Sequence, residues 1–395
     1  MPWREVSAME QRLEFVTLAL SEGANRRELC RRFGISAQTG YKWLRRWQDG
    51  AEGLCDRSRR PHGSPARTAA DVEAAILAVR DAHPAWGARK IARCLSREGL
   101  AAPAPSTVHA VLQRHGRIGG GSGGDNHHYR RFEKPAPNLL WQMDFKGRVP
   151  LAGAGWCHPL TVIDDHSRYA LCLAACGDQR TATVRSALEG AFCRYGLPEA
   201  FFLDNGSPWG GGVPGQWTPL GVWLLKLGVE VIHSRPYHPQ SRGKNERFHR
   251  TLNAELLACN RFRDLACAQT AFDAWRSVYN TRRPHEALGQ EVPATRYAVS
   301  PRPFIDPPPE IVYDDGETLR TVNQSANISF RNRLWRVPKA FRGERVAIRP
   351  RDHDGRFGVF FGAKRIATID VNNDENTNPE TVSHVSEQAS TFSPG

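Results

Sequence analysis

Two segments that contribute little to a packed core interrupt this 395-residue chain. Residues 116–137 contain the run Gly119-Gly-Gly-Ser-Gly-Gly124, and residues 301–309 are rich in proline. Such compositions are typical of linkers, so we expect several separate cores and a multidomain protein. The expected division is 1–56, a helical domain; 57–67, a basic linker; 68–115, a second helical domain; 116–137, a flexible linker; 138–300, the main domain; 301–309, a proline-rich linker; 310–370, a small β-barrel; and 371–395, a disordered tail.

The order of patterns in residues 138–300 predicts an α/β domain. Three short apolar segments separated by turn residues are typical of an antiparallel meander, and alternating helix and strand patterns follow them. This order favours a mixed sheet with helices packed on it. The expected strands are 141–149, 158–164, 169–174, 200–204 and 228–233, and the expected helices are 181–195, 219–227, 239–257 and 265–280.

The C-terminal part has a different pattern. Residues 334–337, 344–348, 357–361 and 364–368 alternate apolar and polar side chains with turns between them, which predicts the small β-barrel. The tail is rich in Asn, Ser, Thr and Glu, a composition that does not support a core.

The first helical domain has the pattern of a helix-turn-helix unit. Asn25 and Ser36 are suited to cap helices at 26–33 and 37–47, and Gly34 lies in the short turn between them. In this motif the second helix enters the major groove of DNA. A plain three-helix bundle with a solvated basic face would give the same pattern. The residues expected to contact DNA are Gln38, Thr39, Tyr41 and Lys42, with Arg45, Arg46, Arg57, Arg59 and Arg60 for phosphates.

Residues 68–115 repeat this arrangement. Apolar residues at helical spacing predict helices around Ile76 and Ile91, and Ser106 begins a third. Two such units in tandem would read an extended DNA site.

The charge balance favours a polyanionic partner. Lys and Arg number 54 against 41 Asp and Glu, which gives a formal charge of +13. Arginine greatly outnumbers lysine, as codon usage in a GC-rich genome would also produce, so composition alone does not decide. The nine cysteines show no zinc-ligand spacing and are expected to be free thiols in a reducing compartment, with Cys157, Cys172 and Cys193 buried. No apolar run approaches the roughly 18 residues of a membrane span. We expect a cytoplasmic bacterial protein with no membrane association.

Three acidic residues point to the chemistry. Asp144 and Asp204 end strand-like runs, and Glu246 lies near the start of a helix that follows a Pro/Gly-rich loop. If the fold brings them together, the three carboxylates need divalent metal to neutralise their repulsion, and hard oxygen ligands suit Mg²⁺. Two ions at such a site carry phosphodiester chemistry without a nucleophilic side chain.

The motifs around these acids resemble those of insertion-sequence transposases with a retroviral-integrase-type core. They are Trp-Gln-Met-Asp144-Phe, Leu-Asp204-Asn-Gly, and Gln-Ser-Arg-Gly-Lys-Asn-Glu246-Arg-Phe-His-Arg. The resemblance covers roughly 135–300 and implies a ribonuclease-H-like fold. It also implies that Asp144, Asp204 and Glu246 form a DDE triad that binds two Mg²⁺ or Mn²⁺ ions. The implied reaction is end cleavage followed by strand transfer from a 3′-hydroxyl.

This resemblance gives the neighbouring residues their expected roles. His238, Lys244, His249 and Arg250 are candidate contacts for DNA phosphate near the cut, with loop packing as the alternative. Asp164 and Asp165 are expected to be structural. The interval between Asp204 and Glu246 is longer than in many relatives, and residues 209–217 look like an added loop that contacts DNA or a partner subunit.

The expected partners are the terminal inverted repeats of a mobile element, target DNA and further copies of the chain, in a dimer or larger complex on DNA. We expect the protein to be associated with the nucleoid. Two alternatives remain open. One is a catalytically silent DNA-binding regulator of the element, and the other is a nuclease of the same fold that cuts without joining.

Overall fold

The computed structural model describes residues 7–57, 67–118, 133–209, 216–233, 243–351, 355–372 and 378–379. The chain divides into two compact units, Met1–Arg67 and Thr68–Gly395. Arg59, Arg60 and His238 lie outside the described residues, as do most of the expected linker 116–137 and most of the expected tail.

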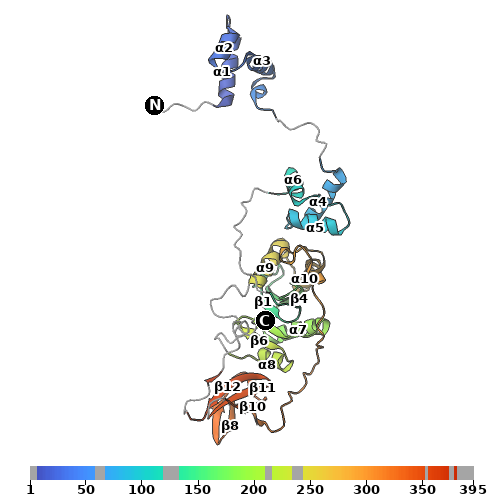
Figure 1. The fold of residues 1–395 in the computed structure, drawn as a ribbon, viewed down its shortest axis with the longest axis vertical. Helices are drawn as coiled ribbons and strands as arrows, with labels where there is room; N and C mark the ends of the chain where they lie inside the picture. Colours follow the sequence, from blue (N-terminus) through green and yellow to red (C-terminus); the bar gives the residue numbers. More distant parts are fainter. Residues whose placement is uncertain are drawn as a thin grey trace, which may run out of the picture. The chain divides into compact units, whose positions relative to one another are not determined.

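The first unit is a three-helix domain, drawn in blue in Figure 1. The hydroxyl of Ser7 accepts from the backbone of Glu10, whose carboxylate accepts from the backbone of Ser7, so a capping box starts the first helix. Asn25 and Ser36 cap the next two helices, as expected. The helices are α1 Ala8–Leu20, α2 Arg26–Arg32 and α3 Ala37–Arg46, followed by 3₁₀ turns at Trp47–Asp49 and Ala51–Leu54.

The close approach of α2 to α3 explains why residue 40 is a glycine. A Cβ at Gly40 would lie 2.4 Å from the sulfur of Cys30 and 2.9 Å from the ring of Phe15. Glycine therefore allows α3 to pack against both α1 and α2. The buried core contains Phe15, Val16, Ala19, Cys30, Trp43 and Leu54.

The second unit begins with another set of three helices, α4 Ala70–Ala82, α5 Ala88–Arg97 and α6 Pro105–Arg114. Their core contains Ile76, Trp86 and Ile91. Glu73 is buried and forms an ion pair with Arg114 and a hydrogen bond with the ring of His115. The expected second helical domain is therefore present.

These three helices also contact the main domain. Val278 packs against their core, and Arg282 forms an ion pair with Glu98 at 2.7 Å. A second ion pair joins Arg89 to Glu286 at 3.2 Å. Residues 68–118 therefore belong to the same compact unit as the main domain.

The main domain is built on a mixed sheet, as the sequence predicted. Its strands follow the order β4-β3-β1-β5-β6, and the short strand β2 also pairs with β3. β3 pairs antiparallel with β1 and β4, whereas β1, β5 and β6 are parallel to one another. The strands are β1 Trp141–Phe145, β2 Val149–Pro150, β3 Trp156–Asp164, β4 Ala170–Cys176, β5 Ala200–Leu203 and β6 Glu230–His233.

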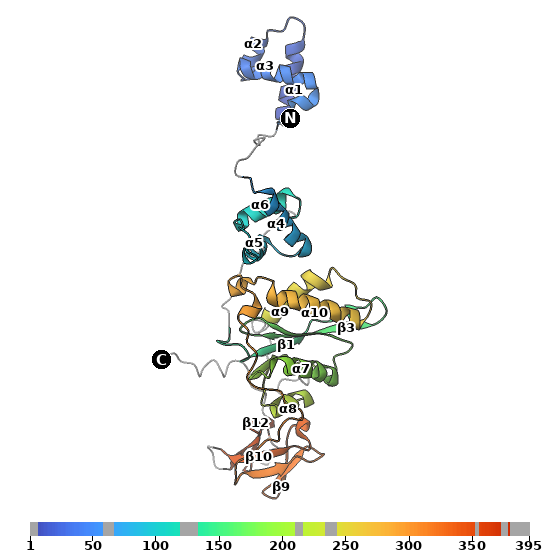
Figure 2. The ribbon, with the colours of Figure 1, turned by 90° about the vertical axis from the view of Figure 1, so that its right-hand side faces the viewer.

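Helices cover both faces of this sheet (Figure 2). Helix α7, Thr181–Tyr195, packs on the face that carries Trp141 and Met143. Helices α9, Gly243–Leu252, and α10, Leu265–Thr281, pack on the face that carries Ile163 and Leu173. The remaining helical elements are α8 Pro219–Lys226, a π-helical turn Asn253–Leu257, and 3₁₀ turns at Glu286–Leu288 and Pro293–Thr295.

The C-terminal domain corrects the expectation of a barrel. Its five-stranded sheet has the order β13-β12-β11-β10-β7, and β8 and β9 form a separate hairpin, so the sheets in the described part of this domain do not close. Alternating side chains define strands but do not determine whether two edge strands meet. The elements are β7 Thr318–Thr321, β8 Asn327–Phe330, β9 Arg333–Arg336, a 3₁₀ turn Lys339–Phe341, β10 Arg345–Pro350, β11 Arg356–Phe361, β12 Lys364–Asp370 and β13 Asn378–Pro379.

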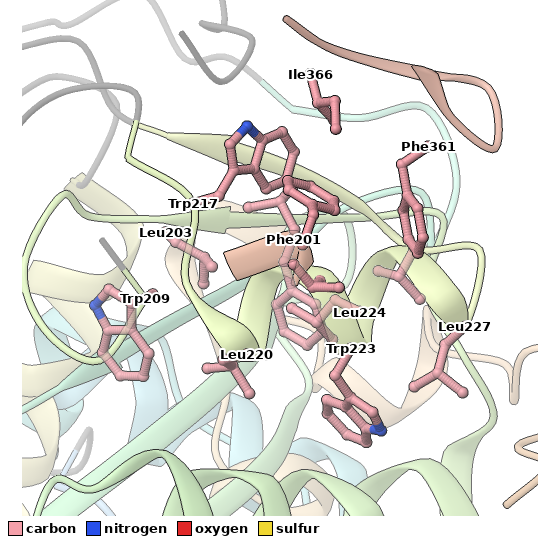
Figure 3. Close-up of a cluster of buried hydrophobic side chains, with 14 of the residues drawn as sticks. Phe201, Leu203, Trp209, Trp217, Leu220, Trp223, Leu224, Leu227, Phe361 and Ile366 are labelled. Carbon is pink, nitrogen blue, oxygen red and sulfur yellow. The ribbon is translucent and has the colours of Figure 1, made fainter. Parts of the chain in front are cut away.

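Trp217, just before α8, joins this domain to the main domain (Figure 3). Trp217 is buried against Phe341, with ring centroids 5.3 Å apart. Trp209 is buried and stacks on Phe145 at 5.2 Å. Both residues were expected in an added loop that contacts DNA or a partner, but their side chains belong to the core. Residues 210–215 lie outside the described residues.

All nine cysteines are free. Cys157 and Cys172 are buried as expected, but Cys193 is exposed. It follows buried Phe192 on α7, and neighbouring positions of a helix face different directions.

Candidate catalytic site and DNA-binding surface

The central parallel strands place two of the three acids at the same end of the sheet. β1 and β5 are parallel, with Trp141 opposite Phe201 and Gln142 opposite Phe202. Continuing this register by two residues sets Asp144 beside Asp204, which directly follows β5. Both acids therefore lie at the carboxyl ends of adjacent parallel strands, where binding sites of α/β sheets are commonly found. Both side chains are partly exposed.

Two hydrogen bonds hold the turn at Asp204. The backbone N–H of Gly206 donates to Asp204 Oδ1 at 2.8 Å, and Nδ1 of buried His233 lies 2.7 Å from the Asp204 carbonyl oxygen. A Cβ at residue 206 would lie 3.2 Å from Oδ1. Glycine at this position therefore lets the chain turn closely around the carboxylate.

Helix α9 carries the third acid. Asn245, Phe248 and Leu252 face the core, whereas Glu246 is exposed. Thr161 lies opposite Asp144 on β3 and donates its hydroxyl proton to the Asp144 carbonyl oxygen at 2.9 Å. The same hydroxyl lies 2.8 Å from His249 Nε2, one helical turn after Glu246. The helix therefore passes close to the strand position of Asp144.

The donor chemistry at this end of the sheet suits a hard divalent cation. The three acids supply carboxylate oxygens, which Mg²⁺ and Mn²⁺ prefer. Within the described ranges, no three Asp, Glu, His or Cys side chains are gathered closely enough to hold a metal ion. What the structure provides is the position of Asp144 and Asp204 at the ends of adjacent parallel strands and the course of α9 beside Asp144.

His249 and Lys244 point inward rather than toward solvent. Burial lowers the pKa of His249 to about 4, so the ring is uncharged at neutral pH. Lys244 forms an ion pair with buried Asp165, and burial lowers the pKa of its ammonium to about 8. Both were expected to contact DNA phosphate. Arg250 is exposed on the same helix, in keeping with that expectation.

Asp164 and Asp165 have the structural positions that the sequence favoured. Both are fully buried. Asp164 accepts hydrogen bonds from the backbone of Asn138 at 2.8 Å and from the hydroxyl of Ser167 at 2.6 Å. Asp165 accepts from Gln142 Nε2 and from the backbone of Lys134, each at 2.8 Å.

A buried ion pair between Arg283 and Glu255 lies just beyond the C-terminal end of α9. Glu255, in the π-helical turn after α9, accepts from Arg283 Nε at 2.8 Å and from Trp275 Nε1 at 3.2 Å. Arg283 also lies over the ring of Tyr279. No local pattern in the sequence pointed to Glu255.

The expected DNA-reading helix exposes a coherent polar face. Gln38, Tyr41, Lys42 and Arg45 are exposed at positions i, i+3, i+4 and i+7 of α3, so their side chains share one side of the helix. Thr39 instead lies beside the cap, 2.9 Å from the hydroxyl of Ser36. Arg46 packs over Trp43, and Arg57 pairs with Asp49.

Sequence reasoning missed Thr161, His233 and Glu255. Each acts through a partner distant in the sequence, and a threonine within a strand or a glutamate on a helix gives no local signal of such a partner.

Five family models match this chain. The integrase core domain matches residues 134–239 and 227–293, and the C-terminal domain of IS481 family transposases matches 317–377. A helix-turn-helix domain matches 11–62, and a homeodomain-like domain matches 39–112.

Similar curated proteins come from bacterial insertion elements. A protein of element IS476 from Xanthomonas euvesicatoria is 32% identical over 42% of this chain and 46% of its own length. A protein of element IS407 from Burkholderia multivorans is 30% identical over 44% of this chain and 60% of its own length. The chain thus spans about half the length of these relatives.

No described helix is long and apolar enough to cross a membrane.

Solved structures that match this chain include the intasome of simian T-cell lymphotropic virus in complex with a PP2A regulatory subunit. The TM-score is 0.39, with 11% identity over 78% of this chain and 98% of that chain. The HTLV-2 integrase catalytic core in complex with magnesium has a TM-score of 0.31 and 15% identity over 41% of this chain and 97% of that chain. The family models and the bacterial relatives show that this chain is similar to insertion-sequence transposases with an integrase-type core.

Proposed function

We propose that this protein is a DDE transposase that binds the terminal inverted repeats of its mobile element. It cleaves the element ends in a metal-dependent reaction and transfers the resulting 3′-hydroxyl strand into target DNA. The observation that carries this proposal is that Asp144 and Asp204 lie at the carboxyl ends of the adjacent parallel strands β1 and β5, with α9 linked to the Asp144 backbone through Thr161. The integrase-core matches cover all three acids.

Each acid has a distinct local support. Asp144 lies on β1, the strand shared by the antiparallel and parallel parts of the sheet. Asp204 is oriented by the N–H of Gly206. Glu246 lies on the exposed side of a helix whose opposite face is buried. These carboxylates would hold two Mg²⁺ or Mn²⁺ ions, which supply activation of the attacking oxygen and stabilisation of the departing one.

Exposed cationic groups suited to DNA lie on two helices, α3 and α9. The exposed face of α3 presents Lys42 and Arg45 together with Gln38 and Tyr41, a set suited to phosphates and base edges. Arg250 is an exposed cation on α9, one turn after Glu246. His249 takes no part as a phosphate-binding cation because its ring is uncharged.

A strand-transfer assay tests this function. The substrate is duplex DNA that carries the inverted repeats flanking the gene, with a plasmid as target. The wild-type protein should yield joined product with Mg²⁺ or Mn²⁺. Glu246→Gln and Asp144→Asn should each lose cleavage and joining by at least about 100-fold while end binding persists, because each removes one metal-ligand charge.

Glu199→Gln is the matched control, since Glu199 is an exposed carboxylate on the same domain. Strand transfer retained in Glu246→Gln would refute the assignment of the triad. Cleaved but unjoined DNA from the wild-type protein would favour a nuclease, and bound but uncut DNA would favour a regulator.

Both ends of an element must be held together for transposition, so the proposed active form is a dimer or larger assembly on DNA. Light scattering of the complex with end DNA measures its mass. Full joining activity in a complex of one chain with one end would contradict this part of the proposal.

A further inference from the structure

Helix α9 is joined to the sheet at two points on either side of Glu246. After Glu246, His249 Nε2 lies 2.8 Å from the hydroxyl of Thr161, which donates to the Asp144 carbonyl oxygen at 2.9 Å. A hydroxyl has one proton, and here it is directed to Asp144. The ring nitrogen is therefore the donor, and the link runs from His249 through Thr161 to the backbone of Asp144.

Before Glu246, the ammonium of Lys244 bonds to a carboxylate oxygen of Asp165 and lies 3.3 Å from its carbonyl oxygen. The same carboxylate oxygen accepts from Gln142 Nε2 at 2.8 Å. Gln142 lies two residues before Asp144 on β1, and Lys244 lies two residues before Glu246 on α9. A fully buried carboxylate thus joins the two elements that carry these acids.

Apolar packing alone would leave the axial position of the helix weakly defined. Phe248 and Leu252 bury the underside of α9, but burial of apolar surface is not directional. Hydrogen bonds depend on distance and angle, so they fix where the helix lies along the strands. One residue of slip moves a helix by about 1.5 Å, whereas a functional site needs its groups within about 0.5 Å.

We propose that Thr161 and His249 are positioning residues that hold Glu246 at the correct place relative to Asp144, with Asp165 and Lys244 as a second anchor. This inference rests on the proposed function, because it assigns Glu246 to the same site as Asp144. It gives His249 a role within the protein instead of a contact with DNA.

Thr161→Val tests the link, because valine has nearly the shape of threonine and lacks the hydroxyl. Thr161→Ser restores the hydroxyl and serves as the rescue. Thr270→Val is the matched control, since Thr270 is exposed on α10 and bonds only to the Ala266 carbonyl within its own helix. His249→Gln provides a second variant that keeps a side-chain N–H donor.

The first readout is the Mg²⁺ concentration that gives half-maximal cleavage of end DNA. Thr161→Val should raise it at least fivefold, and Thr161→Ser should return it to within about twofold of wild type. Thr270→Val should match wild type. A purely structural role for Thr161 would lower the melting temperature without changing the metal requirement of the folded enzyme, and that result would overturn the proposal.

The second readout does not depend on activity. Hydrogen exchange of the backbone amides of α9 and of the following turn, residues 243–257, should be at least threefold faster in Thr161→Val than in Thr161→Ser. His249→Gln should show an intermediate rate. If the wild-type protein cleaves no DNA, the proposed function fails and the exchange measurement alone decides the link. Equal exchange in the valine and serine variants would then refute it.

Discussion

Buried His285 gives a quantitative prediction about stability and pH. Only 8% of its surface is exposed, and its ring lies edge-on to Tyr279 with centroids 4.6 Å apart. Burial is the main cause that lowers its pKa from 6.5 to about 3, and the neighbouring cations Arg283, Lys90 and Arg168 lower it further. A protonated imidazole here would be a further positive charge with little access to water.

The sign of the effect follows from proton binding. Below about pH 6.5 the unfolded chain protonates His285, whereas the folded protein does not until near pH 3. The contribution of uncharged His285 to the free energy of unfolding is thus complete above pH 6.5 and is lost progressively as the pH falls. Each pH unit in this window costs about 1.4 kcal/mol, so acidification from pH 7 to pH 5 removes about 2 kcal/mol through this residue.

His285→Gln tests this value, because glutamine can still donate to the Tyr279 carbonyl oxygen, which lies 3.4 Å from His285 Nε2. Urea denaturation of both proteins at pH 5, 6, 7 and 8 gives the difference in the free energy of unfolding at each pH. Wild type should lose about 2 kcal/mol more than the variant between pH 7 and pH 5. His109→Gln, at an exposed position of α6, should follow wild type. A difference between wild type and His285→Gln that stays constant with pH would refute the reasoning.

Two further predictions concern packing and DNA binding. Trp217→Ala should lower the free energy of unfolding, measured by urea denaturation, by about 3 to 5 kcal/mol, because it opens a cavity against Phe341. Trp156→Ala is the control. Its side chain is 44% exposed, so the same assay should show a loss of less than about 1 kcal/mol. Lys42→Ala and Arg45→Ala should each weaken binding to duplex DNA and reduce the slope of log K against log salt by about 1, measured by fluorescence anisotropy. A salt slope unchanged by either substitution would remove α3 from the DNA interface.

Local signals in the sequence predicted much of the fold. Asn25 and Ser36 cap their helices as expected, and the apolar patterns located the strands that carry Asp144 and precede Asp204. The order of strands and helices was enough to predict a mixed sheet. These features depend on neighbours within a few residues, which is why a single sequence reveals them.

Features that depend on distant partners could not be predicted. Lys244 and His249 were predicted as candidate contacts for DNA phosphate, with loop packing as the alternative, and the partners that draw them inward were not foreseen. Their partners, Asp165 and Thr161, lie about 80 residues earlier in the chain, and no local pattern links them. The prediction that the C-terminal strands close into a barrel was wrong for a related reason. Alternation along each strand gives no information about pairing between the first and last strands.

The buried positions of Trp209 and Trp217 have a consequence for engineering. Each side chain is packed in the core, so the backbone is fixed on both sides of residues 210–215. Lengthening a segment between two fixed points costs mainly closure entropy, about 0.6 kcal/mol for each doubling of its length. An epitope or fluorophore-labelling sequence placed between the two tryptophans should therefore leave the sheet and α8 intact, which makes this interval a rational attachment point for a reporter.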